Sequence, residues 1–208
     1  MDGEDKKTRE RLLESARQEF TAKGYLKASL RKICADAGVT TGALYFFFKD
    51  KEALFASIVE PPLAELDQLL FEQFKAENEL IPETYIHLEG DHDEFAAALI
   101  RHLYANRDEF LLLLKKAQGT RFENVVDEVV ETIEKRYFLV AEKLAGVLPG
   151  KRINRYMLHW LSHNVVDAFR HLLIHEKDVE KAITAMGRFM DFLVGGWMKL
   201  ILEEKEPR

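Results

Sequence analysis

The sequence has little cysteine, proline and glycine, and it has no long apolar run. Cys34 is the only cysteine among 208 residues, so the chain cannot form an internal disulfide or a thiolate metal cluster, and a reducing compartment is expected. No segment approaches the roughly 18 apolar residues of a membrane span. The charged N-terminus is not followed by the apolar run of a signal peptide. We therefore expect a cytoplasmic protein with no membrane partner.

Charge is distributed unevenly along the chain. The net charge is −6 overall, but residues 1–51 hold eleven Lys and Arg against eight Asp and Glu, a net charge of +3. The remaining residues carry a net charge of −9. A basic segment beside an acidic body favours contact between the first segment and phosphate groups. A chance fluctuation in charge is the alternative, because +3 alone decides little.

A 3.6-residue apolar period dominates the chain, and no convincing period-2 alternation appears. The pattern predicts an all-α fold of about nine helices. Gly24 and Gly38 are expected to end helices, and Pro61-Pro62 to kink or split one. The first expected helix is residues 8–23, and two short helices capped by Ser29 and Thr40 follow. A fourth helix, capped by Asp50, extends past Phe74, and residues 80–91 form a connection. The remaining helices are expected at 92–105, 107–118, 122–147, 152–176 and 178–203, with a break at Pro149-Gly150.

The stretch from Ser29 to Phe55 has the pattern of two short helices that meet at a glycine turn. Apolar side chains would lock these helices at a fixed angle, and the second helix would then present its other face to the major groove of DNA. Helices this short need support from the helices before and after them. The locking residues are Ile33, Ala37, Val39, Leu44 and Phe48.

Four elements of this region occur in a fixed order. They are Gly-Tyr after the first helix, Ala-Gly-Val-Thr at the turn, Leu-Tyr in the second short helix, and Phe-Lys-Asp-Lys before the next helix. This order resembles the N-terminal domain of the TetR family of bacterial regulators, closely over residues 8–58. The resemblance implies a helix-turn-helix DNA-binding domain over 1–51 and a helical ligand-sensing and dimerisation domain over 52–208. It also implies a homodimer that binds a double-stranded, palindromic DNA operator, most often as a repressor. A small-molecule effector would release this homodimer from the DNA.

The resemblance assigns roles to residues of the two short helices. The hydroxyls of Thr40 and Thr41 would bond phosphates or bases, and Ala43 would lie near the groove floor and could touch a thymine methyl. Tyr45 and Lys51 would hold phosphates, and Lys51 opens a helix whose N-terminus itself favours anions. The DNA-contacting residues implied in this way are Arg31, Thr40, Thr41, Gly42, Ala43, Tyr45, Phe46, Phe47, Lys49 and Lys51.

Phe47 departs from the family pattern. It stands where members usually have His or Tyr, which can donate a hydrogen bond to a phosphate, and phenylalanine cannot. Phe46 is expected to be exposed in the free protein. Two interpretations stay open: both rings make apolar contacts in the groove, or one of them packs internally against the first helix.

The resemblance also implies an effector pocket between the middle helices. An apolar cavity with a few polar groups would suit a drug-like, aromatic or lipid-derived ligand. Packing in the core is the alternative role for each of these side chains. The candidate pocket residues are His102, Tyr104, Gln118, Tyr137, Trp160, His163 and Asn164.

The family pairs its last two helices with their copies in a four-helix dimer bundle. Gly187, Gly195 and Gly196 lie inside the last expected helix, where each glycine costs about 1 kcal/mol relative to alanine. Such residues suggest a close approach of helices at a dimer seam, and a local kink is the alternative. The candidate dimer residues are Phe169, Leu172, Met190, Leu193, Gly195, Gly196 and Trp197.

Histidines and one aspartate recur every four residues on one expected helix. Neighbouring pairs have the spacing of metal ligands, but no His-Glu-x-x-His motif is present, and a polar or pH-sensitive dimer interface is the other interpretation. The residues are His159, His163, Asp167, His171 and His175.

Two other classes of function compete with the regulator. One is a helical metal-dependent enzyme, for which Glu89-Gly90-Asp91-His92 offers the spacing of a ligand pair without a second copy. The other is a helical interaction module that has lost DNA binding, for which Phe47 gives some support. We expect a regulator, no enzyme activity, no cofactor and no resident metal.

Overall fold

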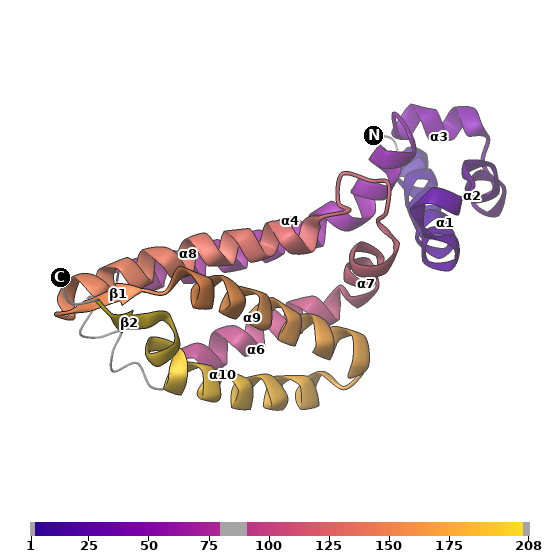
Figure 1. Ribbon diagram of the computed structural model, residues 1–208. Helices are drawn as coiled ribbons and strands as arrows, with labels where there is room; N and C mark the ends of the chain where they lie inside the picture. Colours follow the sequence, from indigo (N-terminus) through magenta and orange to yellow (C-terminus); the bar gives the residue numbers. More distant parts are fainter. Residues whose placement is uncertain (1–2, 80–90, 206–208) are drawn as a thin grey trace. The chain divides into compact units, whose positions relative to one another are not determined.

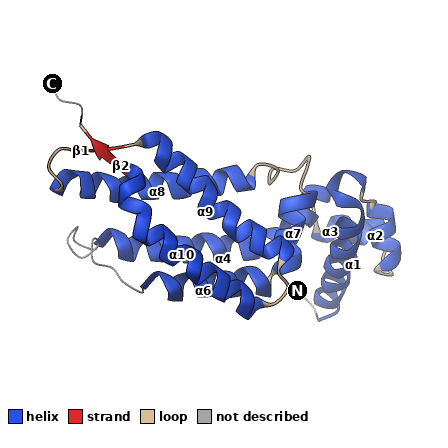
Figure 2. Cartoon of the chain, turned by 60° about the horizontal axis from the view of Figure 1, so that its bottom comes forward, coloured by secondary structure: helices blue, strands red, loops and turns tan. Residues whose placement is uncertain are grey.

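The computed structural model describes residues 3–79 and 91–205, and these residues form nine helices and two short strands (Figure 1). The prediction of an all-α fold is confirmed, and Figure 2 shows how little of the described chain lies outside helices. The elements are α1 (Gly3–Lys27), α2 (Leu30–Asp36), α3 (Thr41–Phe47), α4 (Lys51–Glu79), α6 (Asp91–Ala105), α7 (Arg107–Lys116), α8 (Val125–Val147), β1 (Lys151–Ile153), α9 (Arg155–His175), α10 (Val179–Ile201) and β2 (Leu202–Glu204).

The chain folds into two compact units. The first unit comprises the chain up to Glu65 together with Asn106–Val125, and so contains α1–α3, the start of α4 and α7. The second unit comprises the described parts of Leu66–Ala105 and Val126–Arg208. The first unit is larger than the predicted DNA-binding segment 1–51. The predicted division of function after residue 51 stays a prediction.

The short helices of the first unit begin at their predicted caps. The side-chain oxygens of Ser29, Thr40 and Asp50 each accept a hydrogen bond from the backbone N–H three residues later, at 3.3, 3.1 and 2.8 Å. Gly24 and Gly38 have φ values of 73° and 66°, a left-handed backbone that suits glycine. These caps and turns are local features, which explains why the sequence predicted them.

An aromatic cluster holds the first unit together. The ring of Phe20 on α1 lies 5.1 Å from that of Phe55 on α4, and Tyr25 lies 5.5 Å from Phe55. Phe122, which follows α7, packs against the same Phe55 ring at 6.1 Å. The guanidinium of Arg17 and the carboxylate of Glu109, 3.0 Å apart, join α1 to α7. The segment containing α7 is therefore an integral part of the first unit.

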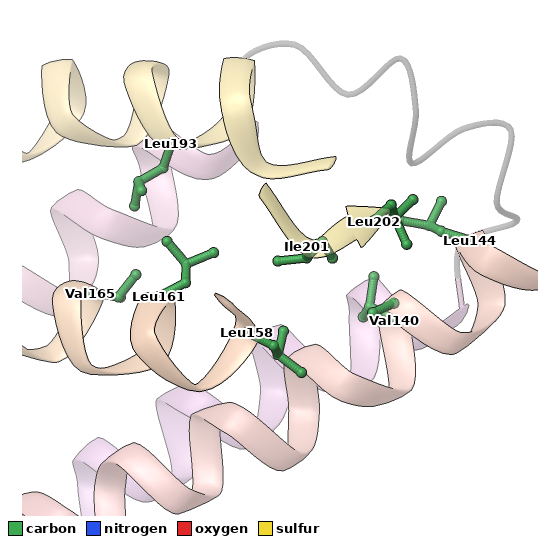
Figure 3. Close-up of a cluster of buried hydrophobic side chains, with 9 residues drawn as sticks. Val140, Leu144, Leu158, Leu161, Val165, Leu193, Ile201 and Leu202 are labelled. Carbon is green, nitrogen blue, oxygen red and sulfur yellow. The ribbon is translucent and has the colours of Figure 1, made fainter. Parts of the chain in front are cut away.

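In the second unit, α8, α9 and α10 enclose an apolar core (Figure 3). Leu161 of α9 and Leu193 of α10 point toward each other, and Leu144 of α8 lies beside Leu202, while Leu158 of α9 and Val140 of α8 belong to the same cluster. A second cluster joins α6 to α10 through Ala96, Ile100, Ala182 and Met186. The helical periods of these segments therefore correspond to faces buried within one chain.

The helical ends predicted at 152–154 and 202–203 are wrong: strands occupy 152–153 and 202–203, and Asn154 caps α9. β1 and β2 pair antiparallel, with Lys151 opposite Glu204 and Arg152 opposite Glu203. Both pairs are ion pairs, the second at 2.9 Å. The backbone N–H of Asn154 also donates to the carbonyl of Ile201 at 2.7 Å. Pairing between distant residues overrides the local helical period here.

Three further predictions concern single segments. The break at Pro149-Gly150 is confirmed, because α8 ends at Val147 and Gly150 has a φ of 76°. At Pro61-Pro62, where a kink or a split was predicted, the split is wrong, because α4 runs continuously through both prolines and Pro62 is buried. A kink at this point stays a prediction. The predicted connection and the Glu89–His92 motif lie outside the described residues, apart from the first residues of α6. Among the described helices, none is long and apolar enough to cross a membrane.

Candidate nucleic-acid interface

Helices α2 and α3 form a compact corner at the surface of the first unit. Gly38 makes the turn, and the backbone N–H of Val39 donates to the carbonyl of Cys34 at 2.9 Å. Ile33 and Leu44 are fully buried on the inner sides of the two helices. The hydroxyl of Ser15 on α1 donates to the carbonyl of Ile33 at 2.9 Å and fixes α2 on α1. The corner is therefore a rigid support for the outer face of α3.

The outer face of α3 is open to solvent. Leu44 and Phe48 point inward and are buried, while Ala43 and Phe47 are half-buried. Because the Thr40 oxygen accepts the cap bond from Ala43, its hydroxyl hydrogen is left to donate outward. The exposed residues of this face are Thr40, Thr41, Gly42, Tyr45 and Phe46.

Aromatic rings form a row at the end of α3. Phe48 is buried, and the guanidinium carbon of Arg9 lies 5.5 Å from its ring centre. The Phe47 ring lies 6.4 Å from Phe48 and 4.9 Å from Phe46. Phe46 itself is 73% exposed. The prediction that Phe46 is exposed is confirmed, and Phe47 lies between the interior and the surface.

Cationic side chains flank this face. Arg31 on α2 and Lys49 after α3 are exposed. Lys51 is half-buried, with its Nζ 4.8 Å from the centre of the Tyr25 ring and 3.4 Å from the carbonyl of Leu26. Burial lowers the pKa of Lys51, and the negative charge of Glu19 partly offsets this effect. The Lys51 ammonium therefore lies over the Tyr25 ring near the end of α1, an arrangement that residue spacing did not predict.

Glu19 is a residue of this site that the sequence did not single out. Its side chain is buried, and its carboxylate accepts a hydrogen bond from the backbone N–H of Ser29 at 3.2 Å. Ser29 is the residue that caps α2, so Glu19 fixes where α2 begins relative to α1. The only sequence feature that could have indicated this role is the position of an acidic residue next to Phe20 on the inner face of α1.

Comparison with known proteins agrees with this geometry. Residues 12–58 match the family described as bacterial regulatory proteins, tetR family. The regulator AcrR of Shigella flexneri is 29% identical over 167 residues, which is 76% of this chain and 77% of that protein. Residues 12–58 therefore have the N-terminal domain of the TetR family of bacterial regulators. The relatives that the chain matches are transcriptional regulators, which agrees with a DNA-binding regulator.

Two further comparisons bear on separate parts of the chain. The transcriptional repressor BepR of Brucella suis is 46% identical over 52 residues, 25% of each chain. The crystal structure of a transcriptional regulator from Aquifex aeolicus VF5 has a TM-score of 0.60 and 23% identity, and covers 89% of this chain and 99% of that chain. The first similarity is confined to a short segment, and the second shows the fold alone.

The candidate effector residues do not all come together in the structure. Gln118 is exposed in the turn after α7, in the first unit, whereas the other six belong to the second unit. Tyr104 on α6 lies with its hydroxyl 3.0 Å from the carbonyl of Leu172 and 3.2 Å from that of Glu176, so it binds the end of α9. Asn164 donates to the carbonyl of Trp160 within its own helix at 2.7 Å. These two polar groups already have partners within the chain.

Other candidate effector residues occupy different depths of the second unit. The ring of Tyr137 lies 6.2 Å from that of Trp197, and burial raises the pKa of the Tyr137 hydroxyl well above its ordinary value. Trp160 is exposed, and His102 and His163 are half-buried. Only Tyr137 and Tyr104 therefore face the packed interior together with other aromatic side chains.

Most candidate dimer residues pack within a single chain. Leu193 is buried in the core of the second unit, and the other large side chains pack partly buried against that core. Gly195 and Gly196 differ, because a Cβ added at either would meet no atom within 4 Å. These two glycines lie beside open space and not at a close approach within the chain. The large candidate residues that pack inward are Phe169, Leu172, Met190 and Trp197.

The histidines that recur every four residues lie along the outer side of α9. His159, His171 and His175 are exposed, and the rings pair as His159 with His163 and His171 with His175, at 4.7 and 4.6 Å. Nδ1 of His159 lies 2.7 Å from the carboxylate of Glu134. Among the described residues, no three potential ligand side chains are grouped so that they could hold a metal ion. The polar-interface interpretation stays open.

Replacing Glu19 tests the link between α1 and α2. In Glu19→Ala, the Ser29 N–H loses a charged acceptor, so we expect the free energy of unfolding to fall by about 1.5–3 kcal/mol. Glu19→Gln should lose less, because its amide oxygen can still accept. Urea unfolding followed by circular dichroism measures both, with exposed Glu10→Ala on the same helix as the control. Equal stabilities for Glu19→Ala and Glu10→Ala would contradict this role.

Proposed function

We propose that the protein is a repressor that binds a palindromic operator as a homodimer and is released by a small apolar or aromatic effector. The observation that carries this proposal is the outer face of α3, which exposes Thr40, Thr41 and Tyr45, while Arg31 and Lys49 are exposed in the segments on either side of α3 and Lys51 opens α4. The description of BepR as a repressor supports the mode of action.

In this proposal α3 enters the major groove. Thr40, Thr41 and Tyr45 donate hydroxyl hydrogens to phosphates, and Lys49 and Lys51 add charge to the same contacts. Arg31 on α2 reaches a base edge or a phosphate. The small residues Gly42 and Ala43 let the backbone of α3 approach the groove floor. Phe47 supplies no donor, so phosphate binding depends on the groups around it.

The salt dependence of DNA binding tests the role of Lys51. Lys51→Ala should weaken binding to every duplex and reduce the slope of log affinity against log salt by about one, because one phosphate contact is lost. Fluorescence anisotropy with duplexes that tile the DNA upstream of the gene measures this at several salt concentrations. Lys75→Ala, an exposed lysine of the second unit, removes the same charge and should leave the slope unchanged. An unaltered slope for Lys51→Ala would remove Lys51 from the phosphate contacts.

The dimer interface is proposed to lie on the outer faces of α9 and α10. Tyr156 and Trp160 form an exposed aromatic pair one helical turn apart on α9, and Phe192 is exposed on α10. Gly195 follows Phe192 by three residues and leaves open space for a neighbouring helix. A dimer sets the spacing of two reading helices, which need half-sites about 34–36 Å apart or a multiple of that distance.

A charged residue on this face should prevent dimerisation. Trp160→Glu would bury unpaired carboxylates at the interface, so we expect monomers and loss of specific operator binding. Leu139→Glu on α8 is the matched control, since Leu139 is 46% exposed and Trp160 is 47% exposed. Sedimentation velocity distinguishes the two outcomes. If both variants remain dimers like the unaltered protein, the interface lies elsewhere.

The effector is proposed to bind in the second unit. Its half-buried aromatic side chains include Phe74, Tyr137 and Trp197, which could line an apolar site once a ligand enters. The covalent continuity of α6 and α8 with the 106–125 segment of the first unit offers a path by which ligand binding could change DNA affinity. We also propose that the protein acts in the cytoplasm, and that DNA reading resides in 1–51 and sensing with dimerisation in 52–208.

Tryptophan fluorescence provides a test of effector binding. Both tryptophans, Trp160 and Trp197, belong to the second unit, and Trp160→Phe leaves Trp197 as the sole reporter. We expect an uncharged aromatic probe, 2-naphthol or a relative, to change the Trp197 emission saturably and to lower operator affinity over the same concentration range. Emission that changes while operator affinity stays constant would separate this site from regulation and contradict the proposal.

A further inference from the structure

Phe46 presents an apolar ring on the face that the proposed function places against DNA. Phe46 is 73% exposed, and its neighbours in the sequence are the exposed Tyr45 and the half-buried Phe47. A phenyl ring can neither donate to a phosphate nor bond the polar atoms of a base edge. Its burial becomes favourable only against an apolar surface of the partner.

The Phe46 ring is held in place from behind. It meets the Phe47 ring nearly edge-on at 4.9 Å, with an angle of 83° between the ring planes. Phe47 in turn lies 6.4 Å from Phe48, which is 3% exposed and carries the Arg9 guanidinium over its ring. The Phe46 ring therefore contacts Phe47 on one side and leaves most of its surface open to a partner.

The major groove offers one apolar group on its base edges, the 5-methyl group of thymine. We propose that Phe46 is a specificity-determining residue that reads this methyl group, and that Phe47 is the positioning residue behind it. The inference rests on the proposed function, since it requires α3 to lie in the major groove. Each half-site would then contain thymine at the one or two positions facing the end of α3, with deoxyuridine or unmethylated cytosine disfavoured there.

Removing single methyl groups from DNA tests the assignment without altering base pairing. The full-length protein first selects its preferred duplex from a randomised pool, and each thymine of that duplex is then replaced in turn by deoxyuridine. We expect a loss of affinity of about fourfold at one or two positions of each half-site, the factor that corresponds to burial of one methyl group. Replacement at the other thymines should change affinity little.

Variants of the protein assign the effect to one ring. Phe46→Ala should bind the thymine duplex with the affinity that the unaltered protein has for the deoxyuridine duplex. This variant should no longer distinguish thymine from deoxyuridine at those positions. Phe71→Ala removes a ring that is 51% exposed on the part of α4 in the second unit, and it should keep the full discrimination. Because Phe46 is exposed, its replacement leaves the core of the first unit intact, which circular dichroism checks.

Three results would overturn the inference. Equal affinity for thymine and deoxyuridine at every position would refute methyl reading while leaving the regulator function in place. Discrimination that persists in Phe46→Ala without loss of affinity would assign the methyl contact to another residue, with the half-buried Ala43 as the first candidate. Discrimination that persists while Phe46→Ala binds both duplexes more weakly by the same factor would show that Phe46 contacts DNA without reading the methyl group. If the unaltered protein selected no duplex over random DNA, the proposed function itself would fail.

Discussion

Helices α2 and α3 are seven residues long each, and helices of this length are not stable in water by themselves. Their existence depends on packing against α1 and the start of α4, around Phe20 and Phe55. The Ser15 and Glu19 side chains fix α2 on α1 by hydrogen bonds. Because the inner sides are held so firmly, the outer face of α3 can remain polar and exposed without loss of the helix. Every DNA contact proposed for this protein relies on that support.

The same support extends beyond the N-terminal helices. Arg121, in the turn before α8, donates its backbone N–H to the carboxylate of Glu52 at 2.9 Å, and its guanidinium pairs with Glu60. Phe122 adds its ring to the Phe55 cluster. The turn after α7 thus holds the first part of α4, which begins with Lys51. The chain passes between the two units three times. Helices α6 and α8 are therefore covalently joined to the segment after α7 that holds the first part of α4.

The second unit uses its long amphipathic helices in two ways. The inner faces of α9 and α10 supply Leu158, Leu161 and Leu193 to one core. Their outer faces carry Trp160 and Phe192, large apolar side chains that the single chain leaves exposed. A helical period in the sequence shows that a face is apolar, but it does not say whether that face packs within the chain or against another copy. Phe169, Leu172 and Met190 pack partly buried within the chain, and their assignment to a dimer seam stays a prediction.

Local chemistry was sufficient to predict much of the first unit. The Ser29, Thr40 and Asp50 caps and the left-handed Gly24 and Gly38 require only neighbouring residues, and the sequence alone determined them, together with the all-α fold and the resemblance of residues 12–58 to the N-terminal domain of the TetR family. Other features depend on residues far apart in the chain. The β1–β2 pair joins residues 151–153 to 202–204, and Glu19 meets the backbone of Ser29 only after α1 and α2 have packed. Tertiary structure alone decided these contacts, and which aromatic rings point inward or outward, because burial depends on how helices pack and not on the period within any one of them.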